Sequence, residues 1–155
     1  MKLLPLDFAT FQGVPIILIP PPQLPLGEVR SIIDKYHDQY VVLCLLRNSD
    51  GKPVVAAGKL DWAYDRKTHV SVVFQELFDQ SSATKIAGPF INFRSRVYGE
   101  SAAFVKHILR NPHNYECLDV VQSTNKEICI GPDKKDYTFV SINRIPNSLL
   151  DCRIN

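Results

Sequence analysis

The sequence predicts an α+β fold, in which two or three helices pack on a small, mainly antiparallel β-sheet. Residues 40–60 have the pattern of a β-hairpin, with two apolar runs on either side of a polar turn. Residues 26–39 and 101–110 instead carry apolar residues three and four positions apart, which is the spacing of a helix with one buried face. Together these patterns predict the α+β class.

The first predicted strand, Val14–Ile19, is a short run rich in β-branched residues that stops at Pro20–Pro22. Because proline has no backbone N–H, we expect these prolines to leave the strand as an extended connector. A helix is predicted next, over Leu26–Gln39. Its apolar positions are Leu26, Val29, Ile32, Ile33 and Tyr36.

The clearest predicted element is a hairpin formed by Tyr40–Leu46 and Pro53–Leu60. The turn between them, Asn48–Lys52, is built from residues that tolerate left-handed backbone. After the hairpin, the polar segment Asp61–Lys67 is interpreted as a loop. The apolar run His69–Phe74 then predicts a third strand.

A fourth strand is predicted over Phe90–Tyr98, because its side chains alternate in character from one residue to the next. Gly99 is expected to end this strand. A helix then starts at Glu100 and runs to about Arg110, before the helix-ending pair Asn111-Pro112. Its acidic start and basic end suit the helix dipole.

The C-terminal part predicts a short helix or turn at Cys117–Ser123 and a second hairpin. The strands of that hairpin are Glu127–Ile130 and Tyr137–Ile142, with residues 131–136 between them. The tail from Pro146 onward is expected to be irregular. Since the chain shows no repeat and no linker, we predict one domain over residues 1–155.

Length and composition set the class of protein. The chain has 155 residues, of which 45% are hydrophobic and 22% charged, so it can bury its own core. No window approaches the roughly 20 apolar residues that cross a bilayer, which excludes a membrane span. The N-terminus does not resemble a secretion signal, because Lys2 is followed by Pro5 and Asp7. We therefore expect a cytoplasmic protein.

The four cysteines do not predict a metal site or a disulfide framework. They are Cys44, Cys117, Cys129 and Cys152, and no two of them have C-x-x-C spacing. We interpret them as small, reduced hydrophobic residues. His107 and His113 have no third ligand at a suitable spacing, so neither a metal nor another cofactor is expected.

Positive charge gathers in the segment 85–110, which holds five Lys or Arg residues and a single acid, Glu100. On the predicted helix, Lys106, His107 and Arg110 share one face, while Phe104, Val105, Ile108 and Leu109 form the apolar face. The preceding predicted strand carries Arg94, Ser95, Arg96 and Tyr98. Such a cationic cluster can attract polyanions.

RNA can be cleaved without a metal when its 2′-hydroxyl attacks the adjacent phosphate. That reaction needs proton transfer and cations placed around the phosphate. The candidate catalytic residues are His107 as general acid or base, Arg94 and Arg96 on the phosphate, and Tyr98 for orientation or stacking. Candidate substrate contacts are Lys106, Arg110 and Ser95. A solvated helix face is the alternative interpretation of this pattern.

Several short segments resemble the small nuclease domains of the barnase, EndoU, colicin and RelE-like superfamily. They are residues 14–17, 40–46, 51–57 and 94–99, followed by the helix with Phe104 and Ile108. The resemblance spans about residues 14–118 and implies a metal-independent endoribonuclease of the toxin type found in phages and mobile elements.

The chain departs from that superfamily in two places. The thirteen residues before Val14 contain no histidine, and the residue after Gly99 is the acidic Glu100. These departures favour the alternative, an inactive descendant that binds RNA or a protein such as an immunity or phage protein.

Overall fold

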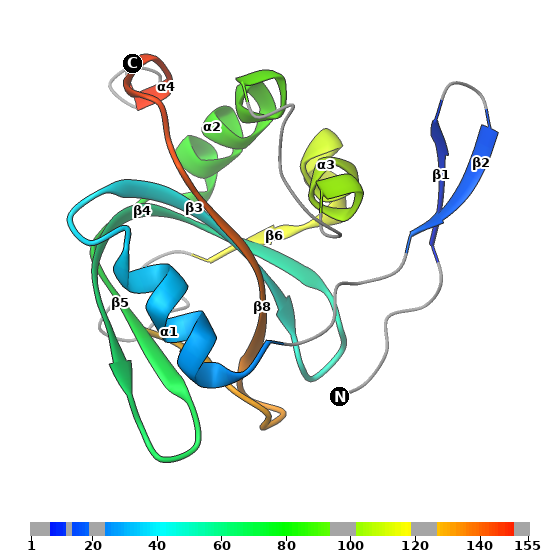
Figure 1. The fold of residues 1–155 in the computed structure, drawn as a ribbon. Helices are drawn as coiled ribbons and strands as arrows, with labels where there is room; N and C mark the ends of the chain where they lie inside the picture. The colour runs from blue at the N-terminus through cyan, green and yellow to red at the C-terminus, as the bar shows by residue number, and fades with distance from the viewer. Residues whose placement is uncertain (1–6, 12–13, 19–23, 94–101, 119–126, 151–155) are drawn as a thin grey trace.

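The computed structural model describes residues 7–11, 14–18, 24–93, 102–118 and 127–150. Its first two strands, β1 (Asp7–Phe11) and β2 (Val14–Leu18), pair antiparallel as a two-stranded sheet. Figure 1 draws this hairpin to one side of the main sheet. The predicted strand at residues 14–19 is thus confirmed through Leu18, whereas Pro20–Pro22 lie outside the described residues.

Within the described residues, a second sheet has six strands in the order β3-β8-β7-β5-β4-β6. The strands are β3 (Tyr40–Arg47), β4 (Pro53–Asp65), β5 (Val70–Leu77), β6 (Glu116–Cys117), β7 (Glu127–Ile130) and β8 (Tyr137–Arg144). Because β3 pairs with both β8 and β4, the sheet closes on itself as a barrel (Figure 1). The α+β class is therefore confirmed.

The sheet is mixed rather than purely antiparallel. β4 pairs in parallel with β6, and β7 pairs in parallel with β8 at Ile130 and Tyr137. The predicted strands at 127–130 and 137–142 are present, but the prediction that they form a hairpin is wrong. The two strands run parallel where they meet, so they do not form a hairpin. Instead, β7 pairs mainly with β5, and β8 pairs mainly with β3.

The predicted β3–β4 hairpin is confirmed, and polar side chains hold its turn. Gly51 has a φ of 74°, the left-handed backbone that the turn requires. The Arg47 side chain donates to both carboxylate oxygens of Asp50, at 3.0 and 2.7 Å. The hydrogen bond from Arg47, aided by the Lys52 amide, lowers the pKa of the Asp50 carboxyl to about 2. The turn is thus stabilised by its own charged residues.

Alternate residues of β3 enter two separate cores. Val41, Leu43 and Leu45 face the barrel interior, which α1 (Leu26–Asp34) covers with Val29 and Ile33. Val42, Cys44 and Leu46 face the opposite way. They pack with buried residues of α2 (Gln80–Phe93), α3 (Ala102–Arg110) and α4 (Asn147–Leu150). Figure 1 shows α1 on one side of the barrel and the other three helices on the other side. This double burial explains why β3 is continuously apolar.

The prediction of a strand over Phe90–Tyr98 is wrong where the structure describes it. Residues 90–93 form the last turn of α2, and residues 94–98 lie outside the described residues. The helix begins at Gln80, and the side chain of the preceding Asp79 accepts a hydrogen bond of 2.8 Å from the Ser82 amide. A short alternating run fits either structure, and here residues 90–93 continue a helix that is capped at its start.

Other predicted boundaries also shift. The helix predicted to run to Gln39 ends at Asp34, because the chain turns sharply through Asp38 at a φ of 62°. Cys117 ends β6 rather than starting a helix or turn. Residues 147–150, expected to be irregular, form α4. The predicted loop at Asp61–Lys67 is instead largely a continuation of β4 to Asp65.

Candidate functional site

The sequence-predicted site is only partly within the described residues. On α3, Val105, Ile108 and Leu109 are buried, whereas Lys106 and His107 are partly exposed and Arg110 is exposed. The predicted cationic face of this helix is therefore confirmed. The other candidate residues, Arg94, Ser95, Arg96 and Tyr98, lie outside the described residues. Their gathering around His107 stays a prediction.

A short 3-10 turn, η1 (Pro112–Asn114), follows α3 and folds back against its end. The Asn114 side chain donates a hydrogen bond of 2.8 Å to the His107 carbonyl, and the Asn111 side chain accepts one of 2.9 Å from the His113 amide. Because of these contacts, η1 presents the exposed His113 beside the C-terminal turn of α3. His113 was not among the residues predicted for the site.

A second surface, which the sequence analysis missed, lies on β4. Two large hydrophobic side chains of the described residues are exposed, Trp62 at 42% and Tyr64 at 39%. In the pairing of β4 with β5, Leu60 lies opposite Phe74 and Ala63 lies opposite Val72. The strand β4 therefore has one more residue than β5 between these two pairs. This β-bulge leaves Ala63 buried in the barrel and turns Trp62 outward.

The Trp62 side chain is held in place by the segment after α1. The His37 ring stacks on the Trp62 indole, with ring centroids 3.5 Å apart and an interplanar angle of 14°. The position of His37 is in turn set by a contact of 2.8 Å between its Nδ1 and the Asp61 carbonyl. We call His37, Trp62 and Tyr64 the aromatic surface.

The aromatic surface lies among charges of both signs. Arg30 on α1 contacts Asp34 at 3.3 Å and Asp65 at 2.7 Å. The guanidinium of Arg66 lies 5.7 Å from the centre of the Tyr64 ring. The carboxylates of Asp38 and Asp65 are 59% and 58% exposed. Arg30 and Asp65 are therefore paired with each other, and the Asp38 side chain adds exposed negative charge next to His37.

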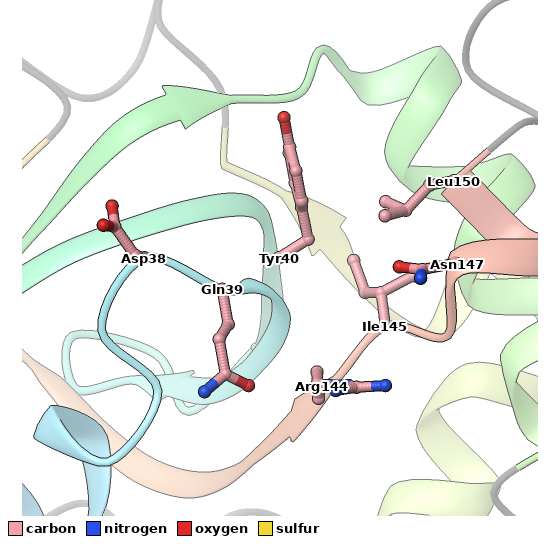
Figure 2. A pocket seen from close by; sticks show the side chains of 7 residues that line it. All are labelled: Asp38, Gln39, Tyr40, Arg144, Ile145, Asn147 and Leu150. Carbon is pink, nitrogen blue, oxygen red and sulfur yellow. The ribbon is translucent and has the colours of Figure 1, made fainter.

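A small pocket of about 180 Å³ opens near the end of β8. Figure 2 shows side chains from residues 38–40, from the end of β8 and from α4 around it. The lining residues are Asp38, Gln39, Tyr40, Arg144, Ile145, Asn147 and Leu150. Since sites for drug-sized ligands occupy about 300–1,000 Å³, this pocket is too small for a nucleotide.

In the described part of the chain, one group of three side chains has the composition of a metal site. One ligand atom from each of His69, Glu127 and Cys129 lies within 4.8 Å of the other two. Burial, and then the neighbouring Glu127 charge, raise the pKa of the Cys129 thiol. The sequence did not reveal this group because β5 and β7 bring together residues that are far apart in the chain.

None of the described helices has the length and apolar character that a bilayer crossing requires. The resemblance to small nuclease domains rests on short segments, one of which, residues 94–99, lies outside the described residues. Comparisons with family models, with curated proteins and with solved structures found no match to this chain, so the resemblance stays a prediction.

Proposed function

We propose that this chain is a protein-binding module, and that its aromatic surface receives a basic segment of the partner. The observation that carries the proposal is the exposure of Trp62 and Tyr64 on β4, on either side of the buried Ala63. Exposed aromatic side chains on a rigid element are typical anchors of protein interfaces, where Trp and Tyr supply much of the binding energy.

The charges around Trp62 favour a basic partner over RNA. The exposed carboxylate of Asp38 would repel a phosphate backbone, and so would that of Asp65, whose charge is partly offset by Arg30 at 2.7 Å. The same carboxylates attract lysine and arginine, and an ammonium or guanidinium group over an indole gains about 0.5–2 kcal/mol. Arg66 already lies over Tyr64, so Trp62 is the expected anchor for the partner's cation.

Trp62 also provides the test, because it is the single tryptophan of the chain and its fluorescence reports on this surface directly. We expect a short peptide of arginine and leucine to change that fluorescence saturably, and a matched peptide with glutamate in place of arginine to have no effect. Anisotropy of a labelled peptide should show that Trp62→Ala weakens binding by about 30-fold or more. Since Trp62 is exposed, the variant should fold as the wild type does.

The control variant is His113→Ala, which removes an exposed side chain from η1 and should leave peptide affinity unchanged. A labelled single-stranded RNA is the competing probe. Saturable RNA binding that is lost in Trp62→Ala would contradict the protein-binding proposal and support an RNA-binding module. Failure of the basic peptide to bind would also contradict it.

A metal-independent endoribonuclease is the second candidate, because α3 and η1 carry two cations and two histidines that are at least partly exposed: Lys106, Arg110, His107 and His113. Lys106 and Arg110 would bind phosphate and His107 would transfer the proton. If this is correct, the purified protein cleaves RNA in the presence of chelator, and His107→Ala slows cleavage by about 100-fold to 10,000-fold.

Trp62→Ala is the matched control for that assay, since its site of change lies on β4 and should leave cleavage intact. No cleavage at high protein concentration would exclude the enzyme and would leave the binding proposal unaffected.

A further inference from the structure

The strand pairing of β5 with β7 gathers His69, Glu127 and Cys129 on one face. Ser71 lies directly opposite Cys129, and Val70 lies opposite Ile130. Val70, Val72, Ile128 and Ile130 belong to the core inside the barrel. Because side chains alternate along a strand, the residues between them face the outer side. His69 precedes Val70, so it shares that face with Ser71, Glu127 and Cys129.

The small Ser71 side chain gives the two longer ones room to converge. His69 and Glu127 lie diagonally on either side of the Ser71–Cys129 pair, and diagonal neighbours on a sheet are within reach of long side chains. The Glu127 carboxylate lies 3.9 Å from the Cys129 sulfur. Ligand atoms on a tetrahedral zinc ion are about 3.3–3.6 Å apart, so small side-chain rotations would close the group around an ion.

Hydroxyl groups support two of the three candidate ligands. The Ser71 hydroxyl, which is completely buried, donates a hydrogen bond of 2.6 Å to the Glu127 carboxylate. The Thr68 hydroxyl lies 3.3 Å from Nδ1 of His69. Metal-bound carboxylates and imidazoles are usually oriented by such neighbours, which fix their direction before the ion arrives.

We propose that His69, Glu127 and Cys129 form a site for Zn²⁺ on the outer face of the barrel. Imidazole nitrogen, carboxylate oxygen and thiolate are the three ligand types that zinc takes in proteins. All three side chains are partly exposed, so an ion can enter from solvent. With three protein ligands, the fourth tetrahedral position would be held by water or by an added ligand.

The test uses the full chain, freed of metal with chelator and kept reduced, and Co²⁺ and Zn²⁺ as probes. We expect one equivalent of Co²⁺ to bind and to produce a thiolate charge-transfer absorption, which Zn²⁺ then displaces. Cys129→Ser should abolish that absorption. His69→Asn and Glu127→Gln should weaken Zn²⁺ binding, measured by competition with a chromophoric chelator, by more than about 100-fold.

Ser71→Ala keeps all three ligands and should weaken zinc binding by about 10-fold to 100-fold, because only the orientation of Glu127 is lost. The matched controls are Cys44→Ala and His113→Asn. They remove a thiol and an imidazole elsewhere and should leave zinc affinity and the cobalt absorption unchanged. Zinc should raise the melting temperature of the wild type and not that of Cys129→Ser, which guards against a variant that merely folds poorly.

Absence of saturable binding overturns the proposal, as does an absorption band that survives in Cys129→Ser. The outcome is independent of the peptide-binding test, because Trp62→Ala retains all three candidate ligands.

Discussion

Replacing Gly58 by alanine is expected to destabilise the barrel by at least about 3 kcal/mol, a large share of the about 5–15 kcal/mol that stabilises a typical domain. Gly58 lies where β4 is paired with β3 on one side, at Val41, and with β5 on the other, at Leu77. A Cβ atom at this position would lie 2.0 Å from the Glu76 carbonyl oxygen and 3.0 Å from the Leu77 Cα. Both are backbone atoms, so relief of the clash requires β5 to move away from β4.

Urea unfolding followed by circular dichroism measures this change. Gly27→Ala is the matched control, because a Cβ at Gly27 on α1 meets nothing within 4 Å. Alanine restricts the unfolded chain and favours a helix, so this control should be neutral or more stable by up to about 1 kcal/mol. If Gly58→Ala unfolds at the same urea concentration as the wild type, the close approach of β4 and β5 described above is wrong.

The second large effect is a loss of stability at alkaline pH that depends on Cys44. Burial raises the pKa of the Cys44 thiol from its ordinary value of 9.0 to about 12. Below pH 9 the thiol is neutral in both the folded and the unfolded chain, so its contribution is fully present. As the pH rises from 9 to 12 only the unfolded chain ionises, which costs the fold about 4 kcal/mol in total.

The measurement compares the free energy of unfolding at pH 8 and pH 10.5, under reducing conditions, for the wild type and Cys44→Ala. The wild type should lose about 2 kcal/mol more than the variant over this interval. Part of the loss should persist in both proteins, because burial also raises the pKa of Tyr115 to about 12. Equal losses in the two proteins would contradict the burial of the thiol.

The parts of the fold that depend on neighbouring residues could be predicted from the sequence. The β3–β4 hairpin follows from a turn whose glycine takes the required left-handed backbone and from two apolar strands beside it. The apolar face of α3 follows from helical spacing in the same way, with Val105, Ile108 and Leu109 buried. In both cases the pattern and the contacts involve residues that are close in the chain.

The rest depends on contacts between distant segments. Closure of the barrel requires β3 to pair with β8, and no local pattern encodes that partner. Trp62 was assigned to a loop because the bulge interrupts the alternation of β4, and its stacking on His37 joins two separate segments. The candidate metal ligands were missed for the same reason, since His69 directly precedes β5 while Glu127 and Cys129 lie on β7.

The Asp34 side chain determines how another molecule can approach the bulge in β4. Beyond Leu60, β4 is no longer paired with β3. On this side of β4, the Asp34 carboxylate accepts a hydrogen bond of 3.1 Å from the Ala63 amide. An incoming polypeptide would need that amide to extend the sheet by another strand. Because an aspartate already satisfies it, the addition of another strand is disfavoured at this point, which favours docking through side chains and opposes strand-to-strand aggregation.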